Sequence, residues 1–383
     1  MPAYILDAVR TPRAKARPDG GLASLKPQDL VAGLVEAVES RGHPARKAEG
    51  LYLGSVGQIG AQGGHIALVS KLKAGLADSA FAISLNNYCV SSLTAVGQAA
   101  AQVAAGNADL VLAGGVEMMS RVPFMADRAD YYSDATFEPR ARYIPVAVAA
   151  DRLADEIGID REALDAVALM SQHRAAAAEG TALVASRIAM NGLDRDEAVR
   201  GLATTAKGLA AMPAAFQPMA EPYADALEGQ SFEYRHTIAH APPMSDGASM
   251  ALVSSSPEGA RARIVAAVEI GGDPHASLTA GFDAMDRALA KAGLTLQDMD
   301  RIEFMEAFAV TIAKLLRDYP IDHDRVNVGG GHLAKGHPMG ASGVILLSSL
   351  LDALDACEGR YGLVVVAGAQ GVGSAMVVER MAR

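Results

Sequence analysis

Cys89 is one of only two cysteines in the chain, and its surroundings favour a reactive thiol. It lies in the segment NNYCVSS, directly before a run of small residues that predicts a buried helix ending near Gly106. Unpaired N–H groups at a helix N-terminus favour a thiolate, so we expect a lowered thiol pKa and a nucleophile. A lone cysteine is also commonly an inert buried residue, and that alternative stays open at this point.

A histidine on a glycine-rich turn could serve as the base for such a thiol. His337 lies in the string GGGHLAKGHPMGASG (329–343), which precedes the apolar sequence VILLSSLLDAL. Glycines let backbone N–H groups approach an acyl oxygen closely, and the string lacks the GxxxxGK[ST] pattern of phosphate-binding loops. If Cys89 and His337 meet, they form a nucleophile and its base. The alternative is a turn histidine bound only to the backbone.

The elements that must position these two residues recur along the chain. Apolar segments form three pairs in the same order at an offset of about 250 residues: 3–10 with 263–270, 50–57 with 301–308, and 110–115 with 364–369. Helix-like stretches follow the first pair, at 29–40 and 282–292. The shared order predicts one α/β unit that is duplicated, and alternation of strands and helices favours mainly parallel sheets covered by helices.

A different kind of segment, roughly 116–260, separates the two copies. It predicts an amphipathic helix that starts after the N-cap Asp160, with Leu164, Val167 and Ala168 on one face. Proline-rich loops and irregularly spaced methionines follow; such methionines usually fill a core, although a few could line a substrate groove. A loop-rich insertion on a rigid core often carries a binding site.

Composition excludes several classes of protein. Of the 383 residues, 50% are hydrophobic and 20% are charged, which excludes a disordered chain, a collagen-like chain and a disulfide scaffold. The net charge of −10 gives no overall basic field for nucleic acid or an anionic membrane surface. The two cysteines show no metal-binding spacing, so we expect no metal site and a reduced, cytoplasmic protein.

Two stretches bear on membrane association. The N-terminal sequence MPAYILDAVRTPRAK has no apolar core of signal-peptide length. The uncharged stretch from Tyr361 to Val378 is nearly long enough to span a bilayer, but its glycines divide it into two short apolar blocks. We therefore predict a strand, a glycine turn and a second strand there, in a soluble protein.

Several motifs, taken together and in order, resemble the thiolases, which are acyl-CoA acyltransferases. The motifs are LDAVRTPRAK near the start, NNYCVSS around Cys89, AGGVEMMSRVPF (113–124), SDGAS (245–249), MEAFA (305–309), GHPMGASG (336–343) and the final GAQGVG with VVER. The resemblance covers nearly the whole chain. It implies an α/β protein with the thiolase fold, in which duplicated α/β/α/β/α halves are related by pseudo-twofold symmetry and carry an inserted loop domain.

The resemblance also implies a domain organisation and an assembly. We place the N-terminal half at 1–118, with part of 246–262 returning to it, the loop domain at 119–245 and the C-terminal half at 263–383. Thiolases are usually homodimers or homotetramers, so a homo-oligomer is expected. The expected ligand is coenzyme A, with its acyl thioester as a substrate and no separate cofactor.

Site residues follow from the same resemblance. It implies that an acyl-CoA acylates Cys89 and that His337 activates the thiol. One oxyanion hole would need His337 and a water held by the asparagine of the family motif NEAF, and the other the backbone N–H groups of Cys89 and Ala369. A second cysteine, in a C-terminal CxGxG loop, moves the proton at the α-carbon in the family.

This sequence departs from that pattern at several positions. Met305 replaces the asparagine of NEAF, Ala367 replaces the second cysteine, and Ala369 replaces a glycine of the same loop. Pro242 replaces a serine that contacts the pantetheine arm in many relatives. Cys357 is predicted to end the preceding helix and not to substitute for the lost thiol. The acylation residues are therefore present, whereas the carbon–carbon half of the mechanism is expected to be impaired.

His332 takes the place of an alanine in the family string GGAxAxGHP. It could take over part of the lost polar role; the alternative is a surface histidine near a phosphate or solvent. Three hypotheses remain for the whole chain: a thiolase-type acyl-CoA acyltransferase, a variant that forms an acyl-enzyme and then transfers or hydrolyses the acyl group, and a non-catalytic subunit of an active thiolase.

Overall fold

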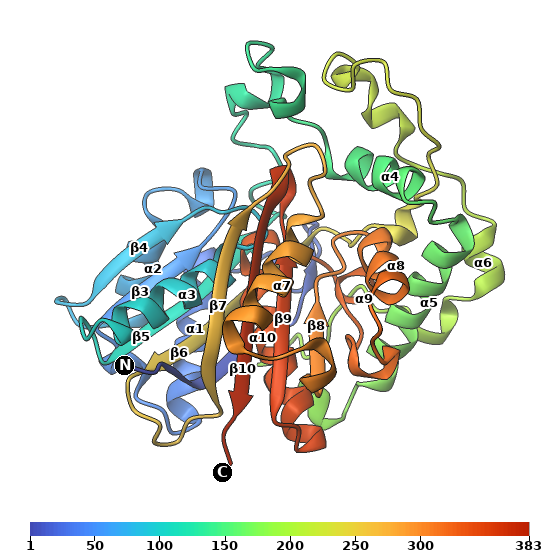
Figure 1. Ribbon diagram of the computed structural model, residues 1–383. Coiled ribbons are helices and arrows are strands. Elements are labelled where there is room, and N and C mark those ends of the chain that lie inside the picture. The colour runs from blue at the N-terminus through green and yellow to red at the C-terminus, as the bar shows by residue number, and fades with distance from the viewer. Residues whose placement is uncertain (383) are drawn as a thin grey trace.

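The strand order contains the same arrangement twice. The computed structural model describes residues 1–382, whose strands form one mixed sheet in the order β4-β3-β5-β6-β1-β7-β10-β9-β8, with β2 paired to β6. The strands are β1 (Tyr4–Arg10), β2 (Ala14–Lys15), β3 (Gly50–Gly54), β4 (Phe81–Leu85), β5 (Leu110–Met118), β6 (Ser245–Ser254), β7 (Ala262–Gly271), β8 (Arg301–Phe304), β9 (Tyr361–Ala367) and β10 (Val372–Arg380). The copies meet where β1 pairs with β7 (Figure 1).

Each strand of the second copy has a counterpart in the first. The order β3-β5-β6-β1 corresponds to β8-β9-β10-β7, and the pairings have the same directions in both: parallel, then antiparallel, then antiparallel. Strand β4 has only a trace of a counterpart, a single parallel bridge from Val326 to Ile302. All three pairs of segments predicted to recur are thus strands, and the duplication is confirmed.

The expectation of mainly parallel sheets is wrong. Only the pairings β3–β4, β3–β5 and β8–β9 are parallel, and the remaining ones are antiparallel. The short turn at 368–371 leaves room only for an antiparallel neighbour after β9, because a parallel connection needs a crossover of a dozen or more residues. The predicted strand, turn and strand between Tyr361 and Val378 is confirmed by β9 and β10.

Helices form three layers around the two half-sheets. They are α1 (Pro27–Ser40), α2 (Ile66–Ala74) and α3 (Ser91–Ala104) in the first copy, and α7 (Ala280–Ala292), α8 (Ala309–Asp318) and α10 (Ser342–Cys357) in the second. Helices α3 and α10 contact each other and strands of both copies, so they form the middle layer. Helices α1 and α2 contact the first half-sheet, and α7 contacts β7, β9 and β10.

Helix α10 is apolar on almost every side. The stretch Met339–Cys357 has the length and composition of a membrane span, but 78% of its apolar window is buried inside the protein. A helix that is hydrophobic all round belongs in a large core or a membrane, and here neighbouring elements of both copies cover it. It therefore packs as the central helix of the core.

The insertion reaches from the upper end of the strands down the side of the second copy (Figure 1). It contains α4 (Val146–Glu156), α5 (Arg161–Ala177), α6 (Ala206–Ala210) and long loops. On the side of the second copy, α5 contacts α8 and α9 (His332–Lys335). Asp160 caps α5, accepting a 2.9 Å hydrogen bond from the Ala163 N–H, and the predicted face of α5 is buried, which confirms the amphipathic helix. The chain then returns to the first copy, where β6 pairs with β1 and β5; the exact limits of the loop domain stay a prediction.

Candidate active site

Cys89 projects from a tight turn between β4 and α3. Tyr88 has a φ of +47°, in the left-handed region that non-glycine residues rarely adopt. Local hydrogen bonds hold this conformation: the Tyr88 N–H donates to Asn86 Oδ1 (3.0 Å), and the Ser91 hydroxyl donates to the Tyr88 carbonyl (2.6 Å). Ser91 Oγ also accepts from the Asn87 N–H (2.8 Å). These local hydrogen bonds set the shape of the turn.

The second copy brings His337 to this thiol. His337 Nε2 lies 3.2 Å from Cys89 Sγ, and Nδ1 lies 2.7 Å from Ser342 Oγ. If Nε2 accepts a hydrogen bond from the thiol, Nδ1 carries the ring proton and donates a hydrogen bond to Ser342 Oγ. The two residues predicted to meet therefore do so. Ser342 was missed in the sequence, although it lies in the motif GHPMGASG and starts α10.

The expectation of a lowered Cys89 pKa is wrong. Burial raises the pKa of the Cys89 thiol to about 12, the Glu117 carboxylate adds to the rise, and only the N–H groups of Ala369 and Cys89 itself oppose it. Burial, with a smaller effect of Arg13, lowers the pKa of His337 to about 3. Both groups are therefore neutral near pH 7, and proton transfer must accompany attack on a substrate.

Glu117 ties the first copy to the turn that carries His337. Its buried carboxylate accepts from the N–H groups of Val56 (2.9 Å), Gly57 (3.1 Å) and Gly340 (3.1 Å). A Cβ atom on Gly340 would lie 2.9 Å from Ser55 Cα, so glycine is needed for this close approach. In the sequence, Glu117 is simply part of the motif AGGVEMMSRVPF, and nothing there predicts that its carboxylate supports the His337 turn.

A second carboxylate supports the same turn from behind. Glu306 is fully buried and accepts from the Leu333 N–H (2.9 Å) and the Ser171 hydroxyl (2.8 Å). Leu333 belongs to the short helix α9 (His332–Lys335) and lies four residues before His337. The Arg13 guanidinium donates to the Gly336 carbonyl (2.9 Å). The His337 turn is therefore held mainly by side chains from other elements: the loop between β1 and β2, helix α5 and the segment after β8.

His332 is completely buried, so the expectation of a surface histidine is wrong. Its ring packs edge-on against that of His337, with centroids 5.1 Å apart, and neither ring nitrogen has a hydrogen-bond partner among residues 1–382. Burial, followed by the charge of Arg13, lowers the His332 pKa well below its usual value. His332 does not line the cavity at Cys89, and its polar role stays a prediction.

Cys89 and His337 open into a cavity of about 230 Å³, called here the acyl cavity. Met305, Ala367, Ala369 and Pro242 also line it, so the structure gathers the positions that depart from the family pattern around the thiol. Methionines of the insertion contribute to the wall: Met119, Met219 and Met244.

Cys357, the last residue of α10, is exposed and lies outside this cavity. Among residues 1–382, no group of three or more His, Cys, Asp or Glu side chains is placed to hold a metal ion.

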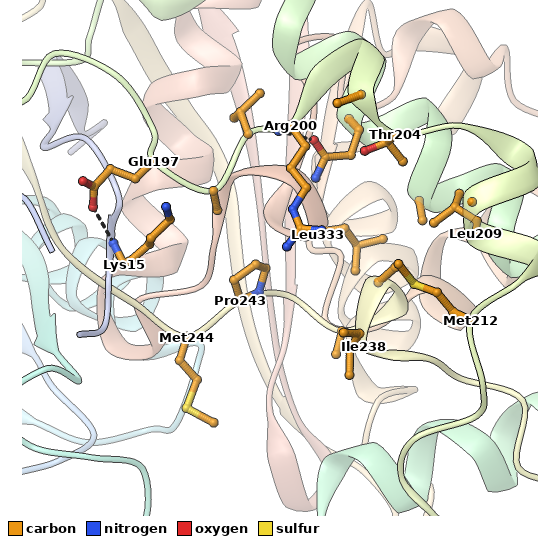
Figure 2. Close-up of a pocket in the computed structure, with 18 of the residues that line it drawn as sticks. Lys15, Glu197, Arg200, Thr204, Leu209, Met212, Ile238, Pro243, Met244 and Leu333 are labelled. Carbon is orange, nitrogen blue, oxygen red and sulfur yellow. Dashed lines mark hydrogen bonds between the residues drawn. The ribbon is translucent and has the colours of Figure 1, made fainter. Parts of the chain in front are cut away.

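A larger groove of about 660 Å³ adjoins the acyl cavity (Figure 2). Ala241 and Met244 line both, and the loop at Pro243 lies between them. Three cationic side chains, those of Lys15, Arg17 and Arg200, line the groove, and each belongs to an exposed residue. Glu197 is the one acidic residue among the described residues that line the groove. The groove therefore combines a net positive charge at the surface with a connection to the cavity at the thiol.

Comparisons with known proteins identify the family. Residues 3–256 match the thiolase N-terminal domain and residues 259–380 match the thiolase C-terminal domain, so the chain belongs to the thiolase family. The chain is 33% identical to the beta-ketoadipyl-CoA thiolase of Acinetobacter baylyi, over 99% of each chain, and 32% identical to the 3-ketoacyl-CoA thiolase of Vibrio cholerae, over 98% of each.

The crystal structure of human mitochondrial 3-ketoacyl-CoA thiolase superposes on this chain with a TM-score of 0.86 and 25% identity, covering 100% of this chain and 99% of that one. The predicted resemblance and the thiolase fold are thereby confirmed, and with them the enzyme class, an acyltransferase.

Proposed function

We propose that this protein uses acyl-CoA thioesters to form an acyl-enzyme on Cys89. The contact of 3.2 Å between Cys89 Sγ and His337 Nε2 carries the proposal. In the proposed step, Nε2 takes the thiol proton as Sγ attacks the thioester carbonyl carbon. The N–H groups of Cys89 and Ala369, which already point at Sγ, stabilise the oxyanion. The bond from carbon to the coenzyme sulfur then breaks, and His337 returns the proton to that sulfur.

Coenzyme A fits the groove beside the acyl cavity. Its nucleotide end carries phosphates, for which Lys15, Arg17 and Arg200 offer positive charge at the groove. A pantetheine arm that follows the shared wall at Ala241 and Met244 would bring the thioester from the groove to Cys89. The coenzyme thioester is then a substrate, and the proposed chemistry uses no further cofactor.

A second candidate function is transfer or hydrolysis of the acyl group without carbon–carbon chemistry. Proton abstraction beside a thioester carbonyl needs a positioned base. Around the acyl cavity, the titratable side chains of the described residues are Cys89, His337 and three tyrosines. Burial raises the pKa of Tyr88, Tyr132 and Tyr143, so their hydroxyls stay protonated near pH 7 and cannot accept the α-proton. Ala367 and Met305 supply no replacement.

Strand β4 offers a surface for a second copy, and we propose a homodimer built on it. Among the described residues β4 pairs with a strand on one side only, and Ile83 in its middle is 42% exposed. Leu68 and Leu72 of the adjacent helix α2 are 40% and 63% exposed. An unpaired, apolar edge strand is a template for pairing with another chain. Ile83→Lys should shift the mass measured by light scattering from dimer to monomer.

Intact-mass spectrometry after incubation with acetyl-CoA tests the central proposal. An acetyl adduct on Cys89, with one free coenzyme A thiol released per adduct, is expected. Loss of the adduct over time without a new acyl-CoA product would favour the hydrolytic candidate, whereas acetoacetyl-CoA formation would favour full thiolase turnover. Absence of any adduct with acetyl-CoA and with longer acyl-CoAs would contradict the proposed function.

A further inference from the structure

We propose that the acyl cavity accepts uncharged, apolar acyl groups and excludes acyl groups that end in a carboxylate. This inference rests on the proposed function, because it assumes that the acyl group bound to Cys89 occupies the cavity. It concerns the substrate class, which the family alone leaves open: the relatives include enzymes named for the dicarboxylic beta-ketoadipyl group and others named for 3-ketoacyl groups in general.

No charged side chain lines the cavity among the described residues. Its wall consists of methionine, aromatic and aliphatic side chains, with Met119, Met305, Phe216 and Phe308 among them. Met119 and Met305 are 5% and 1% exposed, so these positions are closed to bulk water. A carboxylate in such surroundings would lose its hydration and gain no cation in return.

Two of the three tyrosine hydroxyls that the described residues place on the wall are already engaged, and the third, that of Tyr88, brings no positive charge. The Tyr132 hydroxyl donates to Asp127 Oδ2 (3.0 Å), and the Tyr143 hydroxyl donates to Met125 Sδ (3.7 Å). Both hydroxyl protons are therefore already directed away from an acyl chain in the cavity. Asp127 also places a negative charge at the Tyr132 hydroxyl, where it would repel a second carboxylate.

The basic groups of the molecule lie elsewhere. Lys15, Arg17 and Arg200 belong to the adjoining groove, which the coenzyme would occupy. Arg13, the buried cation that acts on His337, donates to the Gly336 carbonyl and lies behind that turn rather than on the cavity wall.

Arg142 lines a neighbouring pocket that shares Tyr132 and Tyr143 with the acyl cavity, but its guanidinium donates to two backbone carbonyls there. No Lys or Arg side chain of the described residues lines the acyl cavity itself. We therefore do not expect this protein to share the dicarboxylic substrate for which the beta-ketoadipyl-CoA thiolase, 33% identical to it, is named.

A matched pair of substrates tests this inference. Hexanoyl-CoA and adipyl-CoA both carry six-carbon acyl groups and differ only in a terminal methyl or carboxylate. Rates of Cys89 acylation, followed by intact-mass spectrometry at pH 7.5, should be about 100-fold or more lower for adipyl-CoA, as expected when an unpaired carboxylate must be buried. Acetyl-CoA, whose acyl group is too short to probe the cavity, reports on the proposed function alone.

The outcomes separate the two proposals. Acylation by acetyl-CoA and hexanoyl-CoA with little by adipyl-CoA supports the inference. Adipyl-CoA rates within tenfold of those for hexanoyl-CoA overturn it while leaving the proposed function intact, as does acylation by acetyl-CoA but not hexanoyl-CoA. Failure of all three overturns the proposed function itself.

A variant tests whether the missing charge is the cause. Met219 lines the cavity but is 43% exposed, so Met219→Lys can place a cation at the rim without burying it fully. The ratio of the adipyl-CoA to the hexanoyl-CoA rate should rise at least about tenfold. Met219→Leu controls for side-chain shape, and Leu202→Lys, at an 80% exposed position outside the cavity, controls for net charge. An unchanged ratio in Met219→Lys, or an equal rise in Leu202→Lys, would overturn the assignment.

Discussion

The turns before α3 and α10 occupy the same place in the two copies, yet they are held in different ways. Cys89 stands on a turn of residues 86–90 whose shape is set by hydrogen bonds within the turn and to Ser91, the first residue of α3, with Tyr88 in a strained conformation. His337 stands on a longer segment, 327–341, that depends on distant carboxylates, Glu117 and Glu306. Duplication thus supplied two facing helix N-termini, and the copies diverged in how each one positions its reactive group.

This difference has a consequence for mutations. Changes in the Cys89 turn should affect chemistry and cost less stability, because its links to other elements are single hydrogen bonds from the Asn86 and Asn87 amides rather than buried carboxylates. Changes around the His337 turn should affect both, because its supports also join separate elements. The predictions below test that contrast, from the largest expected effect to the smallest.

Cys89→Ala should abolish the acyl adduct completely, because the residue supplies the only thiol on the acyl cavity in the described chain. Cys357→Ala should leave the adduct intact, since this thiol lies at the exposed end of α10. Intact-mass spectrometry of both variants with acetyl-CoA makes the comparison. An adduct that persists in Cys89→Ala would move the nucleophile elsewhere.

His337→Gln should slow acylation by about 10²- to 10⁴-fold, the usual contribution of a general base. In the unmodified protein, the lowered pKa of about 3 keeps His337 unprotonated through the ordinary range, so the acylation rate should not fall between pH 8 and pH 5. A histidine with its ordinary pKa would become protonated and lose activity near pH 6.5. An acylation rate that halves near pH 6.5 would show that burial does not lower the pKa of His337.

Restoring the family pattern with Ala367→Cys and Met305→Asn should raise acetoacetyl-CoA cleavage at least about tenfold, because a base or acid and an oxyanion donor return to the cavity. Both positions belong to the second copy, where β8 and β9 end beside the thiol. Acylation of Cys89 by acetyl-CoA serves as the internal control. Fast cleavage by the unmodified protein would mean that another group already moves the α-proton.

Glu306→Ala should lower the free energy of unfolding by about 3 kcal/mol, because buried donors on Leu333 and Ser171 lose their acceptor at about 1–3 kcal/mol each. Asn86→Ala, in the Cys89 turn, should cost less, about 1–2 kcal/mol, because it removes one hydrogen bond within the turn and one to the Val56 carbonyl. Chemical denaturation of the two variants measures the contrast, with Glu306→Gln as the conservative control. Equal losses would show that the two turns are supported alike.

His332→Leu should have the smallest effect and the opposite sign. It removes two buried ring nitrogens that lack partners among the described residues, so stability should rise by about 1–2 kcal/mol. If acylation or turnover nevertheless falls in this more stable variant, His332 has the polar role suggested by its sequence position. A rate unchanged within twofold would leave it as a packing residue behind His337.

The sequence predicted the fold and the pair of reacting residues more accurately than it predicted the pKa values at the site. Recurrent apolar segments predicted the duplication, and two motifs predicted that Cys89 and His337 meet. Strand direction escaped prediction, because buried parallel and antiparallel strands can share one apolar pattern. The pKa of Cys89 was predicted with the wrong sign, since helix position is visible in a sequence whereas burial in an apolar cavity is not.

Supporting residues escaped for a related reason. Glu117 and Gly340 are 223 residues apart in the chain and meet only after both copies have folded. Ser342 lies in the same motif as His337, and a serine in a glycine-rich turn has no feature that marks it as a hydrogen-bond partner of the histidine. Partners so far apart in the sequence form no motif with a fixed spacing from which their contact could be predicted.

Helix α10 has a consequence for how the protein is made. It fills the middle layer, yet the ribosome adds it after the whole first copy and the insertion. Until then, the inner faces of α3 and of strands β1 and β6 lack their apolar cover. At about 5–20 residues per second, this interval lasts tens of seconds, during which the nascent chain is prone to aggregate. Chaperone binding should therefore concentrate on chains that have not yet released residues 342–357.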